Sequence, residues 1–245
     1  MSQPYLIDQI LKGLGFNERT KVKRTPAVAS KILHRDKEGE EMKTDWDYRR
    51  IIGQLNFLEK STRPDIAYAV HQCARFSSNP RAMHKKAVLR IGRYLMATRS
   101  EGLILEPKDS SLELWCDADF SGNWRAEDAH EDRATAKSRT GYIIKYAGCP
   151  ITWASKMQTE IALSTTEAEF IALSEGLRTT IPIMNLMEEM QELGISVMDN
   201  KAKNKLQSVR RQFRGTKHCH IAKAETKDQV HIHQILALQG AFGAR

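Results

Sequence analysis

Carboxylates stand at three places where an α/β fold collects functional groups. Asp117 comes directly after an apolar run at 112–116, and Asp199 follows another at 195–198. Glu169 lies near the start of a long helical pattern between them. In an open α/β sheet, functional groups gather just beyond the strand ends, so we expect these side chains to converge. An all-oxygen site of this kind suits Mg²⁺ or Mn²⁺, and two such ions about 4 Å apart can drive phosphodiester hydrolysis.

Each of these acids also has a simpler explanation. A strand-end aspartate, such as Asp117 or Asp119, is often a cap or a turn former. A glutamate at a helix start, such as Glu167 or Glu169, is favourable to the helix dipole. Asp-x-Asp also occurs as a metal motif in sugar-nucleotide enzymes. The metal interpretation therefore depends on the order of the features, which runs strand–Asp, two hairpin strands, helix with Glu, strand–Asp and basic tail.

Helical patterns dominate the first hundred residues. Pro4 is at a position that the first turn of a helix tolerates, and an apolar stripe follows it and fades at Gly13 and Gly15. Asp45 or Asp47 can cap the next helix. The predicted helices cover about 4–15, 47–61, 65–77 and 81–97, and a polar segment at 17–44 connects the first two.

The pattern changes to strands near residue 102. Strands are predicted at 102–105, 112–116, 142–146, 151–153 and 195–198, with a turn at 148–150. The polar residues 121–139 are expected to form a loop, and a helix is predicted from about 167 to 193, with a kink at Pro182. The sequence therefore predicts a helical segment at 1–107, followed by an α/β domain at 108–245 with a divergent basic tail at about 221–245.

Composition excludes several classes of protein. The chain has 245 residues, of which 41% are hydrophobic, so it can form a core and is neither collagen-like nor of low complexity. It contains no apolar run of about 20 residues and starts without a secretory signal, so we expect no membrane contact. Four widely spaced cysteines suit reduced thiols, which predicts an intracellular protein of the cytoplasm or nucleus.

The positive charge is confined to the end of the chain. Residues 1–199 hold 28 basic and 28 acidic side chains, whereas residues 200–245 hold 10 basic and 2 acidic ones, which accounts for the net charge of +8. A segregated basic segment often binds a polyanion such as nucleic acid, although it can also be a solvated tail. The candidate nucleic-acid-binding residues are Lys201, Lys203, Lys205, Arg210, Arg211, Arg214 and Lys217.

Three other groups have both a functional and a structural explanation. The residues His218, Cys219, His220, His231 and His233 could bind zinc, but their spacing matches no standard finger. Tryptophans 115, 124 and 153 could stack on bases, although a tryptophan beside a strand more often lies in the core. The basic side of the helix at 81–99 could contact phosphate or be a solvated face.

Several ordered motifs resemble a known family. Those in the second half resemble the ribonuclease H domain of copia-type retrotransposon Pol polyproteins, and those in the first half resemble the end of the reverse transcriptase of the same polyproteins. Together they extend over roughly residues 5–220. The motifs are Tyr48 to Phe57, Thr62 to Ala67, His84 to Tyr94, Trp115 to Gly122, Ser138 to Tyr142, Ile151 to Lys156, Ala162 to Ala172, Asp199-Asn200 and Thr216-Lys-His218.

The resemblance implies roles for individual residues. Asp117 matches the first catalytic aspartate, Glu169 the catalytic glutamate and Asp199 the third carboxylate, with Glu167 as a second choice beside Glu169. His220 stands where the family has a fourth acid, and the sequence beyond Ile221 departs from the family pattern. An imidazole is a poor ligand for Mg²⁺ and an acceptable one for Mn²⁺, so weak activity with Mg²⁺ is expected.

The resemblance also implies a fold and an activity. We expect a ribonuclease H-like mixed sheet with flanking helices, which hydrolyses the RNA strand of RNA–DNA hybrids by two-metal catalysis, with other parts of a Pol polyprotein as partners. The paired aspartates of the polymerase core are missing from the chain, so no polymerase activity is expected. A catalytically decayed fragment that at most binds nucleic acid is the alternative. The sequence disfavours a third interpretation, a metal-dependent sugar-nucleotide enzyme, because it contains no nucleotide-binding loop.

Overall fold

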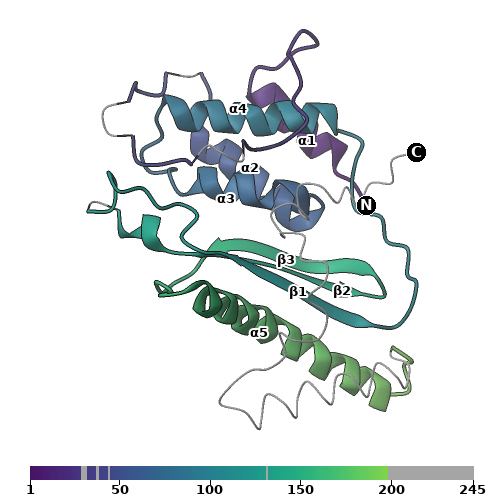
Figure 1. The fold of residues 1–245 in the computed structure, drawn as a ribbon. Helices are drawn as coiled ribbons and strands as arrows, with labels where there is room; N and C mark the ends of the chain where they lie inside the picture. Colours follow the sequence, from purple (N-terminus) through teal and green to yellow (C-terminus); the bar gives the residue numbers. More distant parts are fainter. Residues whose placement is uncertain (29–31, 37–38, 44, 131, 198–245) are drawn as a thin grey trace.

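The protein forms three layers in the computed structural model, which describes residues 1–28, 32–36, 39–43, 45–130 and 132–197 (Figure 1). A group of helices lies on one side of a three-stranded sheet, and a single long helix lies on the other side. The protein is therefore a mixed α/β structure, as expected. The predicted residues Asp199 and His220, and the whole basic tail, lie outside the described residues.

The helical layer consists of α1 (Pro4–Gly13), α2 (Tyr48–Ser61), α3 (Ala67–Ala74) and α4 (Ala82–Ala97), which confirms the helices predicted from periodicity. Asp47 caps α2 by accepting hydrogen bonds from two backbone N–H groups in its first turn. The helices enclose one apolar core, because their apolar stripes face each other. Its fully buried members include Ile10, Leu55, Val70, Ile91 and Leu95.

A buried ion pair closes the corner between α2 and α3. Arg63 is 0% exposed and donates to the Asp65 carboxylate through Nε (2.9 Å) and Nη2 (2.7 Å). Its Nη1 donates to the Thr98 carbonyl oxygen at 2.9 Å, and the Tyr94 hydroxyl donates to Asp65 at 2.7 Å. Every charged group at this corner is therefore hydrogen-bonded, which offsets the cost of removing the ions from water.

The sheet consists of β1 (Leu112–Asp119), β2 (Arg139–Tyr146) and β3 (Cys149–Met157) in the order β1-β2-β3, and all of its pairs are antiparallel. Ala147 and Gly148 join β2 to β3 with positive φ angles of 55° and 79°, the conformation that a two-residue hairpin turn with the right twist requires. The hairpin predicted from sequence is confirmed, but its strands are longer than expected, and its turn lies at residues 147–148 rather than 148–150 because Cys149 and Pro150 already pair with β2.

The long helix α5 (Thr165–Glu192) covers the face of the sheet opposite the helical layer and continues through Pro182. The helix approaches the sheet closely at Gly176, where a Cβ atom would lie only 2.9 Å from Cδ1 of Leu114. Glycine, which has no Cβ atom, permits this approach. The hydroxyls of Tyr142 and Thr179 form a hydrogen bond between sheet and helix at 3.2 Å. Among the described helices, none is long and apolar enough to cross a membrane.

Three sequence-based predictions of strands need correction. Residues 102–105 form no strand, because Leu103 exchanges backbone hydrogen bonds with Met1 rather than with the sheet. Residues 195–197 are also irregular, and the carbonyl oxygen of Val197 accepts a hydrogen bond from the Tyr146 hydroxyl. Finally, β1 does not end at residue 116 but includes Asp117 and Asp119, since pairing with β2 continues along the whole strand.

The helical layer is attached to the sheet by buried polar contacts. Arg139 of β2 is 0% exposed; its Nη1 donates to Nδ1 of His71 on α3 at 3.0 Å, and its guanidinium lies over the Tyr68 ring at 5.2 Å. The Trp153 indole N–H of β3 donates to the backbone oxygen of Glu59 at 2.9 Å. Burial, followed by the charge of Arg139, lowers the pKa of His71 to about 4, whereas burial raises the pKa of Glu59 to about 7.

We predict that Asp65→Asn lowers the free energy of unfolding by about 3–5 kcal/mol, because the change leaves the buried Arg63 guanidinium without a counterion. Chemical denaturation monitored by circular dichroism measures this effect. Asp8→Asn is the matched control, since the Asp8–Arg99 ion pair is exposed to solvent and little change is expected there. Equal effects of the two substitutions would contradict this account of the corner.

We also predict that His71 contributes stability above pH 6.5 and loses it as the pH falls towards 4. The unfolded chain takes up a proton at His71 in this interval, while the folded chain keeps the ring neutral. The free energy of unfolding of the parent, minus that of His71→Asn, should therefore increase from pH 4 to 6.5. A difference that stays constant over this interval would contradict this account of His71.

Candidate active site

Two of the predicted carboxylates come together at one end of β1. The side chains of Asp117, near the end of β1, and Glu169, in the second turn of α5, lie within hydrogen-bonding reach, so that a protonated Glu169 carboxyl can donate to Asp117. The backbone N–H of Ala118 donates a second hydrogen bond to Glu169. Close packing of α5 on the sheet produces this contact, because it aligns the start of the helix with the end of the strand.

The environment of this pair disfavours two negative charges. Burial and then the charge of Asp117 raise the pKa of Glu169 to about 7, while the bond from Ala118 acts in the opposite direction. The neighbouring Cys116 thiol responds to the same surroundings, since burial and the charges of Glu169 and Asp117 raise its pKa to about 11. Oxygen ligands in such a pair are the type that hard divalent cations prefer.

The two glutamates at the start of α5 have different roles in the structure. Ser164 caps the helix by accepting a hydrogen bond from the Glu167 N–H at 3.1 Å, and the Glu167 carboxylate accepts one from the Leu163 N–H at 2.7 Å. Glu167 is thus occupied in capping the helix, whereas Glu169 faces Asp117. The Ser-x-x-Glu spacing in the sequence is a signal for this cap.

Asp119 belongs to the turn that follows β1. Its carboxylate lies against the Cα atom of Gly122, where any larger side chain would collide with it. It is also paired in register with Arg139, whose positive charge it stabilises. This turn is strained at Ser121, which has a positive φ of 48°, and is held by a bond from the Ser121 hydroxyl to the Ala136 oxygen.

The third carboxylate, Asp199, lies outside the described residues, as do His220 and the seven basic candidates from Lys201 to Lys217. The histidine and cysteine cluster proposed for zinc lies there too. Within the described ranges, no group of three or more histidine, cysteine or acidic side chains is placed to hold a metal ion. The metal site therefore stays a prediction that rests on Asp117 and Glu169.

Gln158 is a residue that sequence reasoning missed. It follows β3, is buried, and its Nε2 donates to the Ala168 oxygen of α5 at 2.8 Å and to the Thr140 hydroxyl of β2 at 3.2 Å. It therefore fixes the first turn of α5, and with it Glu169, against the sheet. No motif marks a single glutamine after a strand, so only the tertiary structure reveals this function.

The tryptophans differ from the expectation that they lie in the core. Trp115 is 46% exposed, with the Lys145 ammonium 5.6 Å from its ring centre, and Trp124 is 51% exposed. Trp153 instead bonds to the helical layer. Trp115 lies on the side of β1 opposite Leu114 and α5. It is exposed because the helices on that side, α2 and α3, contact β3 rather than the edge strand β1.

Comparison with known proteins finds relatives among transposon proteins. The chain is 38% identical over 143 residues to the retrovirus-related Pol polyprotein from transposon TNT 1-94 of Nicotiana tabacum, which covers 58% of this chain. It is 35% identical over 150 residues to the corresponding polyprotein from transposon RE1 of Arabidopsis thaliana, which covers 61% of it. It is also 35% identical over 135 residues, or 55% of this chain, to the secreted RxLR effector protein 161 of Plasmopara viticola.

The relatives differ greatly in length. The matched segments cover 10% and 9% of the two Pol polyproteins and 89% of the Plasmopara protein. Neither a protein-family model nor a solved structure matches the chain.

We predict that Gln158→Leu loosens the first turn of α5 and lowers the free energy of unfolding by about 1–3 kcal/mol, because a buried hydrogen-bonding group is removed at nearly constant volume. Hydrogen exchange should become faster for the backbone amides at the start of α5 and stay unchanged in α4. Unchanged exchange in α5 would show that Gln158 does not hold the helix.

Proposed function

Because the chain belongs to the family of retrovirus-related Pol polyproteins of copia-type transposons, we propose that its sheet and α5 are part of a ribonuclease H-like unit that hydrolyses the RNA strand of RNA–DNA hybrids. The contact between Asp117 and Glu169 is the observation that carries this proposal. It joins two acids that are 52 positions apart in the sequence, and this proximity supports a shared site.

The donor set fits a divalent cation. Asp117 and Glu169 supply carboxylate oxygens, and Asp199 is proposed as a third ligand. Mg²⁺ or Mn²⁺ would supply activation of water and neutralisation of charge on the phosphate. Asp117 would hold the cation from β1, and Glu169 would hold it from the helix that Gln158 and Gly176 fix in place. In the hydrolysis itself, the water oxygen bonds to phosphorus, one P–O bond breaks, and the leaving oxygen takes up a proton.

The basic residues from Lys201 to Lys217 are proposed to contact the phosphates of the hybrid, since cations on a nucleic-acid-binding protein release counterions from the backbone. His220 in place of the fourth acid is proposed to weaken binding of one cation. Mn²⁺ tolerates imidazole better than Mg²⁺ does, so higher activity with Mn²⁺ is part of the proposal.

We predict that the chain cleaves a labelled RNA–DNA hybrid with Mn²⁺ and more slowly with Mg²⁺. Asp117→Asn and Glu169→Gln should each reduce the cleavage rate by about 100-fold or more, because each removes a negatively charged oxygen ligand. Glu167→Gln is the matched control, because glutamine also serves in a capping box, and its rate should stay near that of the parent. Gel analysis of the cleaved RNA strand measures the rates of the parent with each metal and of the three variants.

Two results would count against the proposal. Cleavage by Asp117→Asn at the parental rate would show that the assigned pair is not the site. Absence of cleavage by the parent with either metal, in a preparation that still binds the hybrid, would instead favour a non-catalytic nucleic-acid-binding protein.

A further inference from the structure

A groove on the helical layer, away from the Asp117–Glu169 pair, carries a concentrated positive charge. It lies between the segment that follows α1, the residues that precede α2, and α4, and its volume is about 780 Å³. A single acidic side chain, that of Asp45, lines it among the described residues. Its basic lining residues are Arg19, Lys21, Lys23, Lys43, Lys85 and Arg93.

This charge is not neutralised within the described part of the protein. None of the six basic side chains forms an ion pair with a described carboxylate; the ion pairs seen there involve other cations, such as Arg35, Arg63 and Arg99. The Nε atom of Arg93 is buried and has no hydrogen-bond partner among these residues. A polar group in this state favours an anionic partner, and six such cations together produce a strong local potential.

The same groove contains aromatic rings. Phe16 and Trp46 line it and are half-buried, and the Trp46 ring is stacked on Tyr48 with a centroid distance of 6.0 Å. Aromatic rings among cations are typical of surfaces that bind single-stranded nucleic acid, on which bases stack while phosphates meet the positive charge. A duplex offers no unstacked bases for such rings.

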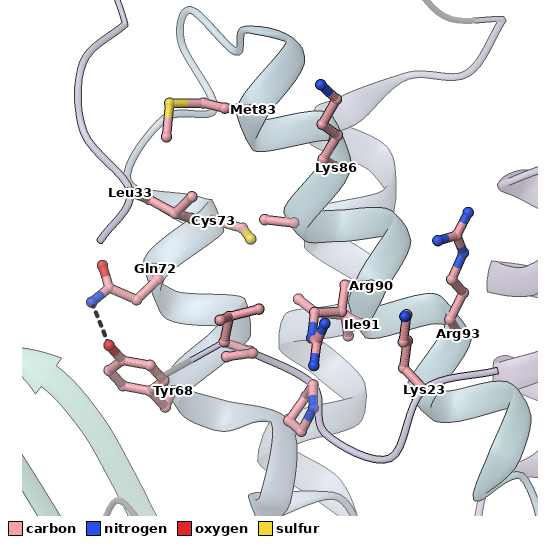
Figure 2. A pocket seen from close by; sticks show the side chains of 15 residues that line it. Lys23, Leu33, Tyr68, Gln72, Cys73, Met83, Lys86, Arg90, Ile91 and Arg93 are labelled. Carbon is pink, nitrogen blue, oxygen red and sulfur yellow. Dashed lines mark hydrogen bonds between the residues drawn. The ribbon is translucent and has the colours of Figure 1, made fainter. Parts of the chain in front are cut away.

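The positive charge continues into a neighbouring cavity of about 220 Å³ between α3 and α4 (Figure 2). Lys23 and Arg93 line both spaces, and Lys86 and Arg90 extend the row along α4. In Figure 2, Lys86, Arg90 and Arg93 project from α4, and Lys23 comes from the segment that crosses it. No acidic residue lines this cavity among the described residues.

We propose that this groove binds single-stranded nucleic acid, with its phosphates on the row of cations and its bases on Phe16 and Trp46. The groove is a site of its own, separate from the proposed cleavage site, because it uses no residue of the Asp117–Glu169 pair and requires no metal ion. Binding measured with a chelator present therefore tests it even if the chain cleaves nothing.

The test compares two triple variants of the full chain by fluorescence anisotropy of a labelled 20-nucleotide single strand in EDTA. Arg19→Gln/Lys21→Gln/Lys43→Gln changes three exposed cations of the groove, and Lys12→Gln/Lys60→Gln/Lys108→Gln changes three exposed cations elsewhere. The groove triple should bind the strand about tenfold more weakly or worse. The slope of log K against log salt concentration should become less steep by about 2, since each of the three lost phosphate contacts contributes about 0.7 to that slope. The second triple should bind like the parent.

A further variant tests the choice of a single strand. Phe16→Leu keeps an apolar side chain against the core but removes the ring, and it should weaken single-strand binding about fivefold or more. Equal losses in the two triples, or no loss in either, would overturn the groove as the binding site. Unchanged affinity in Phe16→Leu, or an equal loss of duplex binding in the groove triple, would overturn the assignment to a single strand.

Discussion

Close packing of α5 on β1 and β2 is the constraint on which the rest of the structure depends. Gly176 allows the helix to approach Leu114 near its middle, and Gln158 fixes its first turn by bonding to the Ala168 oxygen. A helix held at two places along its length can neither slide nor rotate freely over the sheet. Glu169 is therefore brought to Asp117 by the packing of apolar and neutral groups, and the carboxylates themselves do not have to attract each other.

Direct contacts connect the helical layer, which carries the proposed single-strand groove, to the sheet, which carries the proposed cleavage site. Arg139 reaches from β2 to His71 and Tyr68, and the Gln72 amide donates to the Asn123 side chain at 2.8 Å. These contacts connect β2 and the turn after β1 with α3, whose Tyr68 and Gln72 also line the cavity between α3 and α4. A nucleic acid held on the helical layer and one held at the carboxylates would therefore be bound to two layers that these side chains connect directly.

Local sequence patterns predicted the helices and the hairpin, because caps, apolar stripes and turn residues act within a few positions of the chain. Motif and order predicted that Asp117 and Glu169 would lie together, which the structure confirms, while their role as metal ligands stays a prediction. The end of β1 was predicted too early, since pairing with β2 overcame the low strand preference of aspartate. Arg139 and Gln158 could not be recognised, because the groups that they bind belong to other elements; the Arg139–His71 contact spans 68 positions.

The junction between the layers contains two titratable groups that burial shifts in opposite directions. In the interval between the unfolded pKa of Glu59, 4.5, and that of His71, 6.5, the folded protein keeps both side chains uncharged. Unfolding then releases a proton from Glu59 and takes one up at His71, so these two exchanges cancel. The combined contribution of these two groups to the free energy of unfolding therefore changes little with pH over this interval. Either group alone would make the free energy of unfolding depend on pH.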